Sequence, residues 1–233
     1  MMTNIEKNVA DLFEQMVKKM DTSKLMTEDE LKAIEEKRLQ TEKMAIAQTR
    51  LDIMNAPKRL MVNREKLNYN SDWGRTAEGL KKLIGTGTLL VFRGKPGTGK
   101  TQLSVELMIH GIMEKELLAK FETFSRIQMA VKKAFGDSRG ESPVIKKLLS
   151  PDILTIDEFD WVPSSKENAT DGYWQQLMYH VINERYNDMK DTILTSNKSA
   201  VIFAETTLVQ IKSRIAETGG MVSTDGWTDW RGV

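Results

Sequence analysis

The chain has 233 residues, which is enough for one α/β core and a smaller appendage. Its formal net charge of +1 excludes a protein that attracts nucleic acid through its overall charge, so any such binding must come from a local basic patch. The absence of cysteine excludes disulfides and cysteine-ligated metal sites, and a chain with two histidines is a poor candidate for a histidine-based zinc site.

Residues 1–64 differ from the rest of the chain, because they contain no glycine and only one proline, Pro57. Their first apolar residues repeat at spacings of three and four, as one face of a helix does: Ile5, Val9, Phe13, Met16 and Met20. Thr27 then stands three residues before Glu30, a capping box that predicts a second helix running to about residue 55. Two such helices form a hairpin or small bundle, which buries little core alone and is expected to dock on another surface.

From about residue 71, glycines occur and apolar runs alternate with helical periodicity. The expected helices span residues 76–84, 102–115, 127–135, 144–149, 173–188 and 208–217. The expected strands span residues 88–92, 119–125, 153–156, 192–196 and 199–203, the last of these being the final strand. This alternation predicts an α/β fold with a parallel sheet flanked by helices.

The strongest motif is Gly-Lys-Pro-Gly-Thr-Gly-Lys-Thr at residues 94–101, which matches the phosphate-binding loop pattern G-x-x-x-x-G-K-[ST] in full. Its glycines let backbone N–H groups point at phosphate oxygens, and the following helix adds its positive N-terminal end. Lys100 is expected to reach the β- and γ-phosphates of ATP, and the Thr101 hydroxyl to take one position on Mg²⁺. A chance glycine-rich turn is the alternative, but the motif lies in register between a predicted strand and a predicted helix. The residues assigned to nucleotide binding are Gly94, Lys95, Pro96, Gly97, Thr98, Gly99, Lys100, Thr101 and Gln102.

A second motif is the apolar run at residues 153–156, which is followed by Asp157 and Glu158. Asp157 is expected to hold Mg²⁺ through water, and Glu158 to orient or deprotonate the attacking water. Such a run is common by chance, and it gains meaning here from the phosphate-binding loop that precedes it. Asp160 is interpreted as a solvated loop carboxylate.

A third motif is Asn197, which ends the predicted strand at residues 192–196 and is expected to hydrogen-bond the γ-phosphate or the attacking water. A plain strand-end turn is the alternative. The three motifs in this order resemble the additional-strand ATPases of the AAA+ class. A nucleotide kinase would show an arginine-rich lid, and the Asn-Lys-Ser-Ala sequence at residues 197–200 lacks the final Asp of a guanine-reading GTPase motif.

The C-terminal part narrows this resemblance, because the chain after Asn197 is too short for the full helical lid of most AAA+ modules. Further motifs are Asn-Glu-Arg-Tyr at 183–186, Thr-Ser-Asn at 195–197, Arg-Ile at 214–215, Gly-Gly at 219–220 and Trp-Thr-Asp-Trp-Arg at 227–231. Over about residues 75–231 the chain resembles the DnaC/IstB group of bacterial and phage helicase loaders and transposition ATPases, most closely a phage or prophage DnaC-like loader. Gln102 departs from the pattern, since many relatives carry His there.

The resemblance implies roles for three arginines. Arg214 matches the arginine finger, whose charge reaches a γ-phosphate bound by a neighbouring copy, so that self-association through ATPase interfaces is implied. A solvated helix arginine is the alternative for Arg214. Arg231 is either a nucleotide-sensing arginine in cis or a tail residue. Arg185 lies on a predicted helix and is expected to cap it or to pair locally, and a nucleotide or subunit-interface role is the alternative.

Single-stranded DNA is a further partner that the resemblance implies. Basic residues and phenylalanines are interleaved between the phosphate-binding loop and Asp157, a composition that suits phosphate contacts combined with base stacking. These residues are Phe121, Phe124, Lys132, Lys133, Phe135 and Arg139. The alternative is that the phenylalanines belong to the core and the lysines keep the surface soluble, and the sequence favours neither interpretation.

The resemblance also implies that the N-terminal helices bind a hexameric replicative helicase of the DnaB type. Methionines in this region are chemically suited to a partner groove: Met16, Met20, Met44 and Met54. The alternative is a helical hairpin that packs on the ATPase domain of its own chain.

These observations predict an N-terminal helical partner-binding region at residues 1–64 and an AAA+ ATPase domain without a full lid at residues 65–233. The resemblance implies a helicase loader in DNA replication that binds ATP or ADP with Mg²⁺ and hydrolyses ATP. The alternatives are an IstB-like transposition ATPase acting on duplex DNA with a transposase, a metabolic P-loop kinase with no DNA role, and a regulatory module with vestigial hydrolysis. Because no apolar run reaches the roughly 18 to 20 residues of a membrane span, and no secretory signal is present, we expect a cytoplasmic protein without membrane contact.

Overall fold

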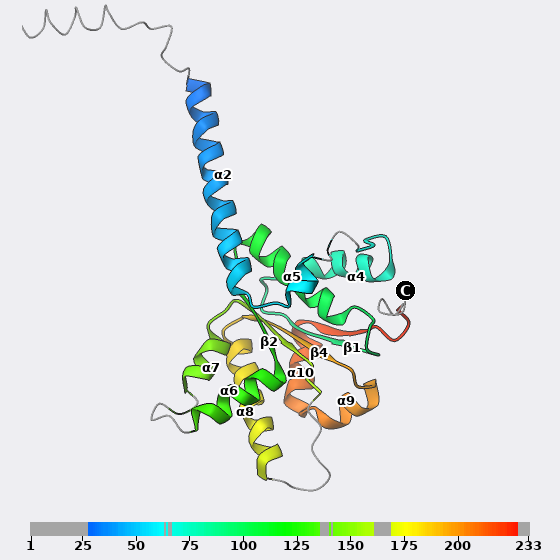
Figure 1. Ribbon diagram of the computed structural model, residues 1–233. Helices are drawn as coiled ribbons and strands as arrows, with labels where there is room; N and C mark the ends of the chain where they lie inside the picture. The colour runs from blue at the N-terminus through cyan, green and yellow to red at the C-terminus, as the bar shows by residue number, and fades with distance from the viewer. Residues whose placement is uncertain are drawn as a thin grey trace, which may run out of the picture. The chain divides into compact units, whose positions relative to one another are not determined.

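Figure 1 shows the computed structural model, which describes residues 28–62, 64, 67–135, 140, 142–160 and 169–227. The chain divides into two compact units, Met1–Ala45 and Ile46–Val233. The domain boundary expected after residue 64 therefore falls inside the second unit. None of the helices within these described ranges is long and apolar enough to cross a membrane.

The described part of the first unit is the beginning of α2 (Glu28–Ile53), whose predicted existence and end near residue 55 are confirmed. Three acidic residues in its first turn favour the helix, because they face the positive end of the helix dipole. Every residue from 28 to 46 is exposed. The helix expected over residues 5–20 and the capping residue Thr27 lie outside the described residues.

The end of α2 belongs to the second unit, and the residue that follows the helix is buried there. The Met54 side chain is fully buried, and its carbonyl accepts a hydrogen bond from the Phe121 N–H at 2.7 Å. Asn55 then adopts a φ of 66°, which ends the helix, and its Nδ2 donates to the Phe121 carbonyl at 3.3 Å. The interpretation of Met54 as a partner-binding methionine is therefore wrong, because this side chain fills the core.

The second unit is built on a parallel five-stranded sheet with the strand order β2-β3-β4-β1-β5. The strands are β1 (Leu89–Arg93), β2 (Ala119–Thr123), β3 (Ile153–Asp157), β4 (Asp191–Ser196) and β5 (Gly220–Ser223). Strand β4 lies between β1 and β3, which confirms the additional-strand sheet expected from the sequence. This order places the ends of β1, β3 and β4 side by side at one edge of the sheet.

Two hydrophobic cores cover the two faces of the sheet, because successive β1 side chains point to opposite sides. One face carries α4 (Asp72–Lys81) and α5 (Lys100–Lys115), together with α3 (Lys58–Val62). The other face carries α6 (Phe124–Ala134), α7 (Ser142–Leu149), α8 (Ala169–Asn187), α9 (Ala200–Thr206) and α10 (Val209–Thr218). Figure 1 shows α4 and α5 on one side of the strands and α6, α8 and α10 on the other.

The strand predicted at residues 199–203 is wrong, because this segment forms α9. Ser199 caps the helix, since its hydroxyl accepts a hydrogen bond from the Ile202 N–H at 3.3 Å. The β-branched pair Val201-Ile202 suggested a strand, but both residues are largely exposed, and only Phe203 reaches the core. The capping residue therefore outweighs local β-propensity.

The last strand of the sheet is instead β5, which the sequence did not reveal. A Cβ at Gly219 would lie 2.2 Å from the Leu89 carbonyl oxygen, so only glycine permits the approach of this segment to β1. Gly220 has a φ of 141°, which also favours glycine. The Gly-Gly pair thus both ends α10 and begins an edge strand.

Arg185 on α8 pairs locally, as expected, and is completely buried. Its guanidinium donates to the Thr192 hydroxyl and to four backbone carbonyls, those of Leu148, Pro151, Asp152 and Asp191. Burial lowers its pKa to about 10, which still leaves it charged at neutral pH. Arg185 therefore holds α7, α8 and the beginning of β4 together.

Candidate nucleotide-binding site

The phosphate-binding loop connects β1 to α5, as predicted. Gly94, Gly97 and Gly99 have φ values of 144°, 88° and 87°, which side chains rarely permit. Helix α5 begins at Lys100, so its N-terminal end opens directly into the loop. The Lys100 Nζ donates to the carbonyls of Gly94 at 2.8 Å and Lys95 at 2.7 Å. The loop is therefore already curled around its own ammonium group.

The strand order brings the Thr101 hydroxyl against Asp157 at the end of β3. The Thr101 Oγ1 donates to the Asp157 Oδ1 at 2.9 Å, and the Thr195 hydroxyl from β4 donates to the same oxygen. Asp157 is buried, with 7% of its surface exposed. A hydroxyl beside a carboxylate offers the oxygen ligands that Mg²⁺ prefers together with nucleotide phosphates, so these residues fit the ion. In the described part of the chain, no group of three or more His, Cys, Asp or Glu side chains is placed to hold a metal.

Glu158 follows Asp157 but points differently, since its side chain is exposed. Its φ of 56° places a non-glycine residue in the left-handed region, a strain that often marks functional sites. The Glu158 N–H donates to the Thr195 hydroxyl at 3.0 Å, which stabilises this turn. The Asp157 carboxylate thus faces Thr101, whereas the Glu158 side chain is exposed to solvent.

Asn197 follows β4, and the structure joins it to Asp160. One Asp160 oxygen accepts from the Ser196 hydroxyl and the Asn197 N–H, each at 2.7 Å, and the other accepts from the Asn197 Nδ2 at 3.0 Å. The interpretation of Asp160 as a solvated loop carboxylate is therefore wrong. Burial lowers the pKa of the neighbouring Lys198, and the charge of Asp160 partly offsets that effect.

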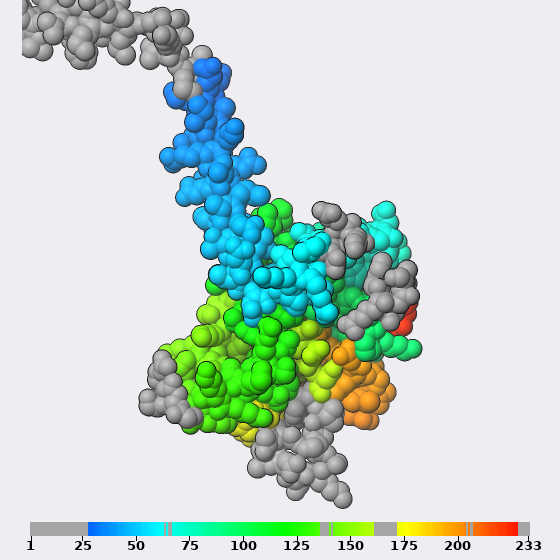
Figure 2. Space-filling model, in the orientation of Figure 1, coloured from blue at the N-terminus to red at the C-terminus, as the bar shows by residue number. Residues whose placement is uncertain are grey.

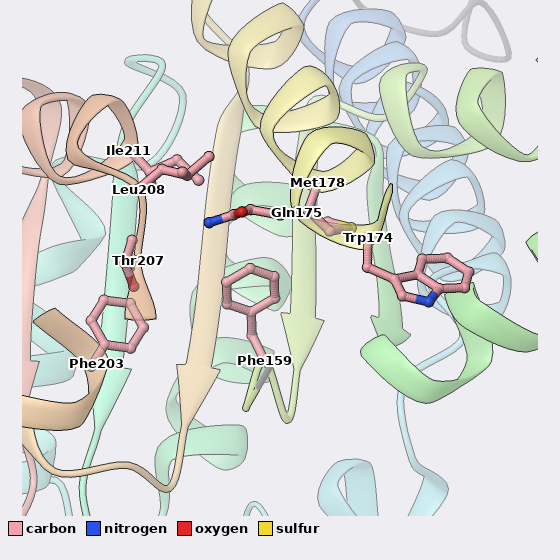
Figure 3. A pocket seen from close by; sticks show the side chains of 8 residues that line it. All are labelled: Phe159, Trp174, Gln175, Met178, Phe203, Thr207, Leu208 and Ile211. Atoms are coloured by element: carbon pink, nitrogen blue, oxygen red, sulfur yellow. The ribbon is translucent and has the colours of Figure 1, made fainter. Parts of the chain in front are cut away.

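Phe159 anchors the turn that carries Glu158 and Asp160. Its N–H donates to the Thr195 carbonyl at 2.8 Å, and its ring enters an apolar cavity between α8, α9 and α10. Figure 3 shows the ring between Phe203 on one side and Trp174 with Met178 on the other. The cavity measures about 20 Å³, which holds little more than a water molecule and so cannot take a nucleotide.

Beyond β5, the chain returns to the phosphate-binding loop, a contact that sequence reasoning missed. Thr224 is fully buried, and its Oγ1 lies 2.6 Å from the Thr98 Oγ1. A Cβ at Gly94 would lie 2.4 Å from the same Thr224 oxygen, so this loop glycine is required for close approach as well as for φ. Asp225 pairs with Arg93 at 2.9 Å, and hydrogen bonds from Ser223 and Arg93 lower the pKa of the Asp225 carboxyl.

The segment between α2 and β1, which includes α3 and α4, also contacts the phosphate-binding loop and α5. The Trp73 Nε1 donates to the Gly99 carbonyl at 3.2 Å, and the Gln102 Nε2 donates to the Leu60 carbonyl at 3.1 Å. The buried Glu106 accepts two bonds from Arg64, at 2.9 and 2.8 Å, and one from the Tyr69 hydroxyl at 3.0 Å. In this structure the side chain of Gln102 therefore holds α3 against α5.

Arg214 lies on α10 and contacts α8 of its own chain. Its guanidinium stacks over the Tyr186 ring at 4.9 Å and approaches the Tyr179 ring at 5.5 Å. It also donates to the Asn183 side chain and to the Gln210 carbonyl. These contacts give Arg214 partners within the chain. Arg231 lies outside the described residues.

The predicted DNA-binding phenylalanines divide into two groups. Phe121 and Phe124 are buried, 0% and 7% exposed, so their assignment to base stacking is wrong. Phe135 is 60% exposed at the end of α6, and its ring centroid lies 5.7 Å from that of Tyr173. Lys132 and Lys133 are exposed on the same helix, and Figure 2 shows α6 and α7 at the surface. Arg139 lies outside the described residues.

Comparisons with known proteins agree with this fold. A family model described as IstB-like ATP binding protein matches residues 5–211. A crystal structure of the DnaC helicase loader is 21% identical with a TM-score of 0.59, over 72% of this chain and 99% of that one. A crystal structure of DnaI is 16% identical with a TM-score of 0.56, over 73% and 95%.

More distant likenesses extend to replication initiators. DnaA bound to AMPPCP and single-stranded DNA is 17% identical with a TM-score of 0.53, over 69% of this chain and 46% of that one. The chain spans less than half the length of DnaA and of a DNA replication initiation factor with the same fold. No curated protein matches the chain. At these identities the solved structures establish the fold, a parallel P-loop sheet of the AAA+ type.

Proposed function

Because the chain belongs to the family of IstB-like ATP-binding proteins, we propose that it is an Mg²⁺-dependent ATPase that helps to place a DnaB-type replicative helicase on single-stranded DNA. The ATPase proposal rests on one observation above all, the meeting of Thr101 and Asp157 at 2.9 Å beside an exposed Glu158. The loader proposal rests on the likeness of the fold to DnaC and DnaI.

Nucleotide binding requires an exchange of partners at Lys100. The ammonium leaves the carbonyls of Gly94 and Lys95 and turns to the β- and γ-phosphates, while the loop N–H groups and the α5 end hold the remaining oxygens. Thr101 and Asp157 would hold Mg²⁺, which would neutralise charge on the phosphates. Glu158 orients and deprotonates the attacking water, and Asn197 contacts that water or the γ-phosphate.

Glu158→Gln tests the hydrolytic assignment, because the amide keeps the shape of the side chain but cannot take a proton. We expect turnover to be lost while a fluorescent ATP analogue binds as tightly as to the wild-type chain. Glu114→Gln, an exposed residue near the far end of α5, is the matched control and should keep full turnover. Wild-type turnover in Glu158→Gln would show that this carboxylate is not the base.

Arg214 is proposed to act on ATP bound by a neighbouring copy, which requires it to leave Tyr186 and Asn183. A complementation experiment tests the action between copies. Lys100→Ala removes the phosphate contact but keeps the finger, and Arg214→Ala does the reverse. A mixture of the two chains should recover ATPase activity that neither has alone, and full activity in Arg214→Ala would reject the finger.

Single-stranded DNA is proposed to bind the surface of α6 around Phe135, where an exposed ring adjoins exposed lysines. Loss of one stacked base weakens binding by about 5-fold or more, so Phe135→Ala should show at least that loss in fluorescence anisotropy with an oligo-dT probe. Met129→Ala is the matched control, since Met129 is 65% exposed on the same helix. Equal affinity in Phe135→Ala would exclude this surface.

The helicase is proposed to bind the first unit, where apolar side chains on α2 are exposed. Leu31, Ile34, Leu39 and Met44 are all more than half exposed, at 53–55%. Native mass measurement of the protein mixed with a hexameric DnaB-type helicase, with and without ATP, tests the interaction. We expect a complex that Leu31→Asp with Ile34→Asp abolishes. No complex in either nucleotide state would reject the loader function and leave the ATPase standing.

The description of the matching family favours one alternative, a transposition ATPase that acts on duplex DNA with a transposase. The two functions differ in the nucleic acid that stimulates hydrolysis. Stimulation by single-stranded DNA together with a helicase complex supports the loader, whereas stimulation by duplex DNA alone, without a helicase complex, supports the transposition ATPase.

A further inference from the structure

Asp160 carries an arrangement of hydrogen bonds that the motifs do not explain. Its carboxylate accepts three bonds, and all three come from the end of β4: from the Ser196 hydroxyl, the Asn197 N–H and the Asn197 side-chain amide. Asp160 lies three residues after Asp157 and is itself partly buried. One side chain from the β3 side of the site thus holds both the backbone and the side chain of Asn197.

The chemistry of these groups fixes the orientation of the Asn197 amide. An ionised carboxylate only accepts hydrogen bonds, so the Asn197 group that faces Asp160 at 3.0 Å must be the NH₂ and not the carbonyl. The Asn197 Oδ1 is therefore directed away from Asp160. Without this contact, an exposed asparagine after a strand would rotate freely between several rotamers.

Asp160 is in turn held by a rigid turn. The Asp160 N–H donates to the Glu158 carbonyl at 2.7 Å, and the N–H groups of Glu158 and Phe159 both donate to Thr195. The Phe159 ring anchors the turn, because it projects from the turn into the apolar cavity between α8 and α9 (Figure 3). The position of Asp160 relative to β4 is therefore determined by Glu158, Phe159 and Thr195.

We propose that Asp160 is a positioning residue for ATP hydrolysis, which orients the Asn197 amide so that its Oδ1 and its remaining N–H face the attacking water and the γ-phosphate. The inference deepens the proposed ATPase function and rests on it. Asp160 itself touches neither nucleotide nor water in this scheme. Its proposed effect on turnover acts through the Asn197 side chain, and that property makes the inference testable.

A double-mutant cycle on Asp160 and Asn197 provides the test, with the turnover number and the affinity for a fluorescent ATP analogue as separate readouts. Asp160→Ala should lower turnover by about 10-fold or more, a typical effect of misplacing a group that contacts the attacking water, and leave nucleotide affinity within about 2-fold. Asn197→Ala should show a similar loss. The double variant should be no slower than Asn197→Ala, because the side-chain amide that Asp160 orients is already absent from Asn197→Ala.

Two further variants sharpen the result. Asp160→Asn keeps the shape but supplies a single carbonyl acceptor for three donors, so turnover should fall between that of wild type and Asp160→Ala. Asp188→Ala is the matched control, because Asp188 is an exposed carboxylate just before the opposite end of β4. It should keep wild-type turnover.

The inference is overturned if the two losses multiply in the double variant, if Asn197→Ala turns over normally, or if Asp160→Ala loses nucleotide affinity as strongly as turnover. These outcomes differ from failure of the proposed function, which would show as no ATP turnover in the wild-type chain. Normal turnover in Asp160→Ala beside an inactive Glu158→Gln would reject the inference and leave the ATPase intact.

Discussion

The contact between Thr224 and the phosphate-binding loop predicts that the chain beyond β5 contributes to nucleotide affinity. The Thr98 hydroxyl has a single hydrogen, and it lies 2.9 Å from the Lys95 carbonyl and 2.6 Å from the Thr224 hydroxyl. The Thr224 hydroxyl also has a single hydrogen, and its oxygen lies 3.2 Å from the Arg93 carbonyl, so the two hydroxyls share two hydrogens among three contacts. When Lys100 turns to the phosphates, the Lys95 carbonyl loses one of its two donors, and Thr98 is the donor that stays.

Thr224→Val removes the hydroxyl and keeps the branched shape, so the perturbation is confined to the neutral contacts of this hydroxyl with Thr98 and with the Arg93 carbonyl. A neutral hydrogen bond contributes about 0.5–1.5 kcal/mol, which corresponds to a loss in nucleotide affinity of about 2- to 13-fold if the loop alone bears the effect. Thr224→Ser restores the hydroxyl and should restore affinity. Titration with a fluorescent ATP analogue measures the change, and thermal unfolding monitors the fold.

Thr88→Val is the matched control for this prediction. Thr88 is equally buried, and its hydroxyl donates to the Thr218 carbonyl at 2.9 Å near the opposite end of β1. This variant should lower the unfolding temperature without changing nucleotide affinity. Equal affinity in Thr224→Val and wild type would refute the reasoning, and so would an equal loss of affinity in Thr88→Val.

Two further predictions concern stability. Arg185→Met removes a buried charge and leaves five acceptors without their donor, which should lower the free energy of unfolding by about 3–5 kcal/mol and the unfolding temperature by about 6–20 °C in thermal scans. Arg185→Lys lacks the planar guanidinium and should have an intermediate unfolding temperature. An unfolding temperature of Arg185→Met within about 2 °C of wild type would contradict this prediction. Burial, followed by the charges of Lys81 and Lys115, lowers the pKa of His110 below its ordinary value of 6.5. The unfolded chain therefore takes up this proton first, so stability should fall as the pH drops through that region. In urea unfolding between about pH 7.5 and 5.5, His110→Gln should show a smaller fall, and an equal fall would contradict the assignment.

The sequence was sufficient for those parts of the site that short motifs encode. The loop at residues 94–101 requires glycines at fixed offsets, so its conformation can be predicted from local sterics, and the structure shows these glycines at positive φ. The contact between Thr101 and Asp157 follows from the strand order, because only β4 separates the end of β3 from β1, which the loop follows. The catalytic roles assigned to Glu158, Asn197 and Arg214 remain predictions.

The remaining parts depend on contacts between residues far apart in the chain, which carry no local signature. Asp160 was misread because nothing in its own segment shows that Asn197, 37 residues later, supplies its hydrogen bonds. Thr224 was missed for the same reason, since its partner Thr98 lies 126 residues away. The strand predicted at residues 199–203 was wrong for a different reason, because local β-propensity and a helix cap disagreed there and the cap prevailed.

The missed residues share one physical role, which is to fix groups that the motifs only place nearby. Thr195 illustrates this, because its hydroxyl contacts Asp157 and accepts from the Glu158 N–H, while its carbonyl accepts from the Phe159 N–H. Asp160 then fixes Asn197, and Thr224 supports Thr98. Each contact joins the end of one strand to the loop or strand end beside it, so the ends of β1, β3, β4 and β5 form one hydrogen-bonded layer. In the proposed ATPase, a prearranged layer of this kind would favour hydrolysis, because little reorganisation of these groups would remain at the moment of reaction.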